Sequence, residues 1–497
     1  MKKLAYGLIA IAGFSFWFFI GFPFGHHNES YLWAVHLKSL ALSDAILHKM
    51  VPVANHRPLG QAVIWLTYKL SGGSIVPAQV FNYVVGVAAW LVMVFALKER
   101  KVFSALAMVV GGIFFSGYIY MFHLHGAFYS PLLLLVGLFF LLFEGPFSSR
   151  KYIWAAGAAF LISLFHPYAL LFFIGGTVGL YLEQRSTITR ANVWLLLASL
   201  LVALVGVKIL VFAPGNDVVI PVWRMIAGFV SSYAMVEVNL AVSCVAGLLS
   251  VLTALSIDMA KPLKLSLILA TGALSVACVV AGFPVLLCWV AICMLKMVML
   301  RKWWILFYII VAAGIPAITP SGSPTYTLFV IMGCTAAVGY GWQRLENMLD
   351  FLRPRVGVAL IVACVGLSVV LRQGVRVPFL SQLVTPMIAE REKTIQLEEI
   401  IQWALTSDHR NDELVFAQDA LNPSDAADAI DRRHRPPTSQ EYLDAYLDSI
   451  RGENVNEVAH KGRLTIRFGD VATSFPGALY VNDRPFAHTA VVEPSVR

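Results

Sequence analysis

A polar segment from His26 to Pro58 carries most of the residues that could do chemistry, and it interrupts an otherwise apolar N-terminal region. Its two carboxylates, Glu29 and Asp44, are the candidates for a general base. A carboxylate near the end of a membrane helix is partly desolvated, and desolvation raises its proton affinity toward the range that suits proton abstraction from a hydroxyl. The alternative interpretation of Glu29 is structural: it caps a helix that begins at Ser30, or it simply faces water.

Arg57 lies at the end of this segment, directly before an apolar stretch. A guanidinium at the membrane surface can bind a phosphate through two parallel hydrogen bonds. The alternative is snorkelling, in which the long side chain only carries its charge to water. Lys208 and Arg224 are candidates for the same phosphate-binding role. Lys208 lies inside an apolar segment near its outer end and could also snorkel, and Arg224 either lines a cavity or pairs with Glu237.

Histidines and one tyrosine lie in the same loops as these charges. We expect them to hydrogen-bond a phosphate or sugar hydroxyls, and the candidates are His26, His27, His56, His123, His125, Tyr129 and His166. The closely spaced histidine pairs could supply metal ligands if their loops meet, but no HExxH-type framework accompanies them, so neither a metal nor another cofactor is expected. His166 is also explained as a buried, hydrogen-bonded core histidine.

The elements that must position these residues are membrane helices. The chain has 497 residues, of which 58% are hydrophobic and 13% charged, whereas a soluble domain has about 25% charged residues. Repeated apolar runs of about 20 residues indicate an all-α polytopic membrane protein. The net charge of +8 does not indicate nucleic-acid binding, because many basic residues lie in short loops between apolar segments. The six cysteines lie in or beside these segments and indicate no disulfide framework.

Three apolar segments, near residues 152–182, 264–295 and 303–341, are too long for single helices and contain internal prolines. We interpret each as a helical hairpin, which gives about 13 spans over residues 1–372. The loop lysines and arginines then fall mostly on one side, which the positive-inside rule assigns to the cytoplasm. We therefore expect a retained first span with a cytoplasmic N-terminus, and a first outer loop over residues 25–73. The remaining apolar segments lie near residues 4–24, 74–97, 102–122, 131–149, 192–213, 238–257 and 355–371.

Residues 373–497 have the charged composition of a soluble domain. The periodicity predicts amphipathic helices over residues 394–405 and 439–450, and short strands over 464–469 and 478–493, with a turn at Val481–Asp483. With about 13 spans, an odd number, the two ends of the chain lie on opposite sides of the membrane. We therefore expect this small α+β domain to lie outside the cytoplasm.

The order of these features resembles the polytopic GT-C glycosyltransferases. The closest pattern is that of the TMTC-type protein O-mannosyltransferase group, in which an Arg-Pro-Leu run is followed by an apolar helix, a proline, and a span that opens with an aromatic residue and an asparagine. The matching residues are His56–Leu59 and then Val76–Asn82, and the resemblance covers about residues 1–100. That family usually has an aspartate after the first span, often paired with another acid, whereas this chain has the single Glu29.

The resemblance implies an inverting transferase that takes its sugar from a polyprenyl-phosphate donor on the outer face of a bacterial cytoplasmic membrane. Glu29 or Asp44 would act as the base, and Arg57, with Lys208 or Arg224, would hold the lipid phosphate. The partners would be the lipid-linked donor, the membrane, and a cell-envelope glycan, lipid or protein as acceptor, but no nucleic acid.

Two other functions remain open from the sequence. A flippase or transporter of a lipid-linked sugar would show repeated halves and charges deep in several spans, whereas the chain shows no repeat and few deep charges. A non-catalytic envelope assembly protein would depend on its C-terminal domain and would be insensitive to substitutions at Glu29 and Arg57.

Overall fold

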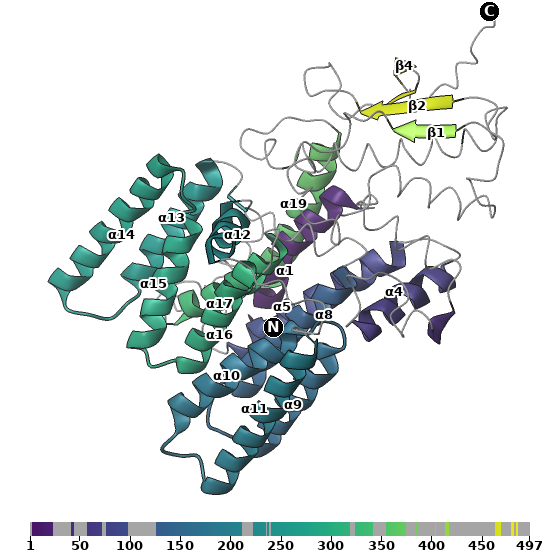
Figure 1. Cartoon of the computed structure of the whole chain (residues 1–497). Helices are drawn as coiled ribbons and strands as arrows, with labels where there is room; N and C mark the ends of the chain where they lie inside the picture. The colour runs from purple at the N-terminus through teal and green to yellow at the C-terminus, as the bar shows by residue number, and fades with distance from the viewer. Residues whose placement is uncertain are drawn as a thin grey trace, which may run out of the picture.

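The computed structural model describes residues 2–22, 41–43, 57–71, 76–97, 126–210, 222–234, 236–237, 240–318, 324–340 and 354–373, single positions at 384 and 403, and four short strands between 413 and 485. Helices dominate these ranges (Figure 1). Those in the first half of the chain are α1 (Lys2–Gly21), α4 (Pro58–Leu70), α5 (Val76–Ala96), α8 (Gly126–Phe143), α9 (Ser149–Ser163), α10 (Tyr168–Gln184), α11 (Arg190–Leu210) and α12 (Val222–Ala234). Those that follow are α13 (Leu240–Leu255), α14 (Lys261–Ala281), α15 (Leu286–Met299), α16 (Trp303–Gly314), the 3-10 helix η3 (Ile315–Ile318), α17 (Pro324–Gly339) and α19 (Pro354–Arg372).

Five of the described helices are long and apolar enough to cross a membrane, namely α5, α8, α11, α14 and α19. The side chains of α11 and α14 are mostly exposed, and they are largely leucine and valine; Val280, for example, is 83% exposed. A helix with such a surface is stable in lipid, where its backbone groups are all bonded internally. The prediction of a helical, multi-pass membrane protein is confirmed.

The three proline-containing segments are each divided into two helices, as the sequence predicts. The first breaks at residues 164–167, the second at 282–285, and the third at η3, between α16 and α17. The second break shows why the helix stops. Gly282 has φ +65°, a left-handed conformation that glycine adopts without strain, and Pro284 cannot continue the α14 hydrogen-bond ladder.

Small residues bring α10 and α16 into close contact. A Cβ atom at Gly179 would lie 2.5 Å from the carbonyl oxygen of Trp303, and one at Gly175 would lie 3.2 Å from that of Phe307. Glycines one helical turn apart let two backbones approach, which is how membrane helices maximise van der Waals contact. Elsewhere α1 packs against α19, where Arg372 donates to the carbonyl of Phe19 over 3.2 Å.

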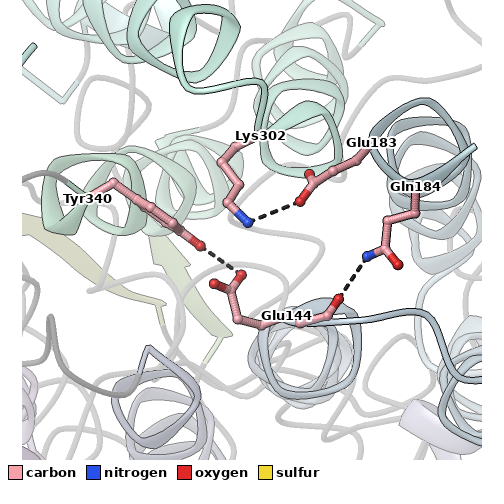
Figure 2. Close-up of polar contacts among 6 residues, drawn as sticks. Glu144, Glu183, Gln184, Lys302 and Tyr340 are labelled. Carbon is pink, nitrogen blue, oxygen red and sulfur yellow. Dashed lines mark hydrogen bonds and ion pairs between the residues drawn. The ribbon is translucent and has the colours of Figure 1, made fainter. Parts of the chain in front are cut away.

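A network of polar side chains joins α8, α10, α16 and α17 at one end of the bundle (Figure 2). Tyr340, directly after α17, donates to Glu144, directly after α8, over 2.7 Å. Lys302, before α16, forms an ion pair with Glu183 of α10 over 3.0 Å. All these residues stand at helix ends or directly beside them. We call this end of the bundle the Lys302 end.

The C-terminal region contains a four-stranded sheet in the order β1-β2-β3-β4. Strand β1 (Glu413–Phe416) runs parallel to β2 (Arg463–Phe468), and β2 runs antiparallel to β3 (Leu479–Val481), which pairs with β4 (Arg484–Pro485). Strand β2 confirms the strand predicted over residues 464–469, and β3 and β4 lie within the strand segment predicted over 478–493, whereas β1 was missed. The predicted turn at Val481–Asp483 lies partly outside the described residues. The helices predicted for residues 394–405 and 439–450 lie outside the described residues, apart from position 403.

Candidate functional site

Several of the predicted site residues lie outside the described residues: His26, His27, Glu29, Asp44, His56, His123 and His125. The side chain of Arg224 is also outside them, although its backbone belongs to α12. Their predicted roles stay predictions. Arg57, Tyr129 and His166 are described, and the structure brings these three together.

Arg57 is held at the start of α4 by contacts with two other segments. Pro58 occupies the first helical position, where its missing N–H costs nothing. The N–H of Leu59 donates over 3.1 Å to the carbonyl of Leu164, in the turn between α9 and α10. A Cβ atom at Gly60 would overlap the ring of Phe128 on α8. The beginning of α4 is therefore packed directly against α8 and tied to the α9–α10 turn.

Aromatic side chains from three helices surround the guanidinium. Its carbon lies 5.0 Å from the ring centroid of Phe128 and 5.7 Å from that of Tyr129. The hydroxyl of Tyr129 lies 3.4 Å from that of Tyr326, and the ring of Tyr168 lies 5.4 Å from that of Tyr326. The group that we call the Arg57 cluster consists of Arg57, Phe128, Tyr129, His166, Tyr168 and Tyr326.

The tyrosines of the cluster share one position in the fold, because each stands in the first turn of its helix: Tyr129 in α8, Tyr168 in α10 and Tyr326 in α17. The last turns of the same helices, or the residues directly after them, form the Lys302 end. The cluster and the Lys302 end are therefore at opposite ends of the bundle.

Arg57 is a cation without an acidic partner among the described residues. The ion pair found among those residues joins Lys302 to Glu183 instead. Arg57 as a whole residue is intermediate in exposure. Burial lowers the pKa of Arg57, the phenol oxygens of Tyr129, Tyr326 and Tyr168 raise it, and the net direction is upward. The guanidinium stays charged, and the rings beside it stabilise the charge without neutralising it.

His166 offers a hydrogen-bond donor next to this cation. The imidazole is fully buried, its ring centroid lies 5.1 Å from that of Tyr129, and its Nδ1 accepts the backbone N–H of Tyr168 over 3.3 Å. Burial, and then the charge of Arg57, lower the pKa of His166 well below its ordinary value, so the ring is neutral and carries its proton on Nε2. That Nε2 has no hydrogen-bond partner in the described part of the chain. A buried donor without a partner needs an explanation, and a ligand in the cluster would supply one.

Buried polar side chains lie at the same end of α4, α5 and α8. Ser130, next to Tyr129, donates over 3.2 Å to Asn82 of α5, which is the asparagine of the resemblance. Gln61, one turn after Arg57, and Gln79 are both fully buried. Amides and hydroxyls inside an apolar bundle are costly unless they are hydrogen-bonded, and the Ser130–Asn82 bond meets this requirement for those two side chains.

The remaining candidates lie elsewhere. Lys208 is exposed near the end of α11, and no contact recorded for it reaches the Arg57 cluster. Glu237 accepts hydrogen bonds from Ser243 over 2.9 Å, from the backbone N–H of Val285 over 3.0 Å, and from that of Leu286. The carboxylate thereby caps the N-terminus of α15, a structural role that the sequence did not indicate.

Sequence reasoning missed Phe128 and Tyr326. Tyr326 follows Pro324 at the third proline break, as Tyr168 follows Pro167 at the first. A tyrosine within two residues of such a proline is a signal that could have found it. In the comparisons with known proteins, no family model, no curated protein and no solved structure matches the chain.

Proposed function

We propose that the chain is a GT-C-type glycosyltransferase, which moves a sugar from a polyprenyl-phosphate donor to an acceptor hydroxyl and inverts the anomeric carbon. The observation that carries the proposal is the Arg57 cluster. Among the residues that the structure describes, it combines a cation without an acidic partner, three phenol hydroxyls and an imidazole N–H without a hydrogen-bond partner. The cation can bind the phosphate of a lipid-linked donor, and the phenol hydroxyls and the imidazole N–H can hydrogen-bond to sugar hydroxyls.

The chemistry places modest demands on the protein. The acceptor oxygen attacks the anomeric carbon, the bond to the phosphate oxygen breaks, and the lipid phosphate leaves with the bonding electrons. Phosphate is a good leaving group, so the transition state needs a cation rather than an acid, and Arg57 supplies it. The acceptor proton passes to a carboxylate base, for which Glu29 and Asp44 are the candidates from sequence.

The proposal includes an orientation. We place the Lys302 end, beside the basic residues Arg150, Lys151 and Arg185, in the cytoplasm, and therefore the Arg57 cluster and the C-terminal domain on the outer side of a bacterial inner membrane. About 13 spans satisfy this arrangement. A reporter enzyme that is active only outside the cytoplasm, fused to the C-terminus, tests it.

The decisive experiment offers labelled polyprenyl-phosphate sugars to the purified protein and to the variants Glu29→Gln, Asp44→Asn and Arg57→Ala. We expect transfer by the wild type and a strong loss in Arg57→Ala and in one carboxylate variant. If no donor yields product, or all three variants keep the full rate, the enzyme proposal fails.

The same preparation separates the alternatives. A flippase would move the lipid-linked sugar across a reconstituted vesicle without cleaving it. An assembly protein would keep its function in all three variants and lose it when the chain is truncated from about Arg376, since the helical bundle ends close to that position.

A further inference from the structure

Two cysteines face each other across the turn between α14 and α15. Cys278 lies in the last turn of α14 and Cys288 in the first turn of α15, and their Sγ atoms are 3.5 Å apart. Both are free thiols and mostly buried, with 9% and 6% of their surface exposed. This separation is longer than the roughly 2.05 Å of a disulfide bond, so the two sulfur atoms lie in contact and unbonded.

The backbone on both sides of the turn is fixed by hydrogen bonds. The carbonyl of Cys278 accepts the N–H of Phe283 over 2.8 Å, which together with Gly282 makes a Schellman cap at the end of α14. The N–H of Cys288 donates to Val285 over 2.9 Å. The approach of the two sulfur atoms is therefore a property of an ordered turn and not of two loose chain ends.

The turn lies at the end of the bundle that carries the Arg57 cluster. Helix α15 runs from this turn to Met299, and Lys302 follows three residues later at the opposite end. The placement of the turn outside the cytoplasm rests on the orientation given under the proposed function, and not on the transferase activity. Disulfides form and persist in compartments outside the bacterial cytoplasm.

We infer that Cys278 and Cys288 are a disulfide site that covalently joins α14 to α15. The oxidant is a protein disulfide of the thiol-oxidising class. One cysteine thiolate attacks it to form a mixed disulfide, and the other displaces the oxidant's sulfur to close the Cys278–Cys288 bond. Two thiols are oxidised, the oxidant's disulfide is reduced to two thiols, and the two cysteine protons end on those thiols.

The bond would stabilise a specific contact. Val285 and Leu286, between the two cysteines, donate the backbone N–H groups that Glu237 accepts. Joining the helices on either side holds these donors in place, and with them the connection between α12 and α13.

The test maps the cysteines of the full-length protein from its native membrane. Membranes are dissolved in denaturant with excess N-ethylmaleimide, and peptides are analysed before and after reduction. We expect a linked Cys278–Cys288 peptide and alkylation of both cysteines only after reduction. The exposed Cys244 should be alkylated at once and serves as the internal control. Alkylation of Cys278 and Cys288 without reduction would overturn the inference, as would a metal ion released from them on denaturation.

Matched variants show that the link is specific. In Cys278→Ser, Cys288 should become alkylated without reduction, and the reverse should hold in Cys288→Ser. Cys293→Ser is the control on α15, because Cys293 contacts Cys334 in the core instead; it should leave the link intact. A link from Cys288 to Cys293 or another cysteine would contradict the assignment.

Discussion

The guanidinium carbon of Arg57 lies 5.0 Å from the centroid of the Phe128 ring, and the same ring fills the space beside Gly60 one turn further along α4. Phe128 therefore fixes both the helix that carries the cation and the cation itself. A cation over an aromatic face gains about 0.5–2 kcal/mol without losing its charge. The N–H groups at the edge of the guanidinium remain suited to an anion.

We predict that Arg57→Ala weakens binding of a polyprenyl phosphate by about 10- to 100-fold, since a hydrogen bond to a charged group contributes about 1.5–3 kcal/mol. Arg57→Lys should weaken the same binding by about tenfold, because an ammonium group cannot form two parallel hydrogen bonds to a phosphate and does not stack on an aromatic ring. Equilibrium binding of the labelled lipid to purified protein measures both. Lys69→Ala is the matched control on α4, since Lys69 lies at the other end of that helix, 5.9 Å from the ring centroid of Trp65. An equal loss of affinity in Lys69→Ala would mean that binding depends only on the positive charge of α4 and not on the position of Arg57.

The hydroxyls of Tyr129 and Tyr326 lead to a second prediction. Each phenylalanine substitution removes one oxygen from a pair 3.4 Å apart, and we expect a loss in transfer rate of about 2- to 10-fold per hydroxyl. The double variant should lose less than the product of the two, because the hydroxyls contact each other. Tyr308→Phe is the control: that hydroxyl donates to the carbonyl of Phe329 in the core over 2.7 Å, so its loss should lower stability and leave the specific activity unchanged.

His166 should make stability depend on pH. Its pKa is lowered by burial and by Arg57, so below about pH 6.5 the unfolded chain binds a proton that the folded protein does not. Stability then rises with pH in this range and falls by up to about 1.4 kcal/mol per unit of acidification, until the imidazole titrates in the fold. His166→Gln removes this contribution, so its melting temperature should fall less than that of the wild type between pH 7 and 5. Parallel curves for the two proteins would contradict a lowered pKa of His166, because they require the same pKa in the folded and unfolded chain.

The sequence was sufficient for the helical class because apolar runs and internal prolines act locally. The same reasoning selected Arg57, Tyr129 and His166, which stand next to helix ends where polar residues have few structural uses. It could not select Phe128, which is one of many aromatic residues in an apolar chain and gains its role only through the packing of α4 on α8.

The role of Glu237 could not be predicted from the sequence. The sequence offered it only as a partner of Arg224, and only the tertiary structure shows that the N-terminus of α15 lies beside it. A cap contributed by a residue 48 positions away in sequence from its Val285 donor leaves no local pattern.

Gly179 gives a steric prediction. A methyl group there would lie 2.5 Å from the carbonyl of Trp303, so Gly179→Ala must push α10 away from α16, at a cost of about 1–3 kcal/mol. Because α10 carries Tyr168 at its other end, the variant should lose thermal stability and binding together. Gly157→Ala is the matched control on the exposed face of α9, where a Cβ atom meets nothing within 4 Å. Equal melting temperatures for the two variants would contradict the close crossing.

Glu237 provides the last prediction, which separates its charge from its hydrogen bonds. Burial raises the pKa of this carboxyl, and the hydrogen bonds from Leu286, Ser243 and Val285 lower it, with an upward net direction. The folded protein therefore holds a proton that the unfolded chain releases, and this group's contribution to stability falls as pH rises above about 4.5. Glu237→Ala leaves two backbone N–H groups without their acceptor and should cost about 1–3 kcal/mol. Glu237→Gln keeps an acceptor oxygen and buries no charge, so it should melt close to the wild type at pH 7 and show a weaker dependence on pH. Thermal unfolding of the three proteins between pH 4 and 8 measures both effects. If the Gln variant is as unstable as the Ala variant, the negative charge of Glu237 itself stabilises the N-terminus of α15.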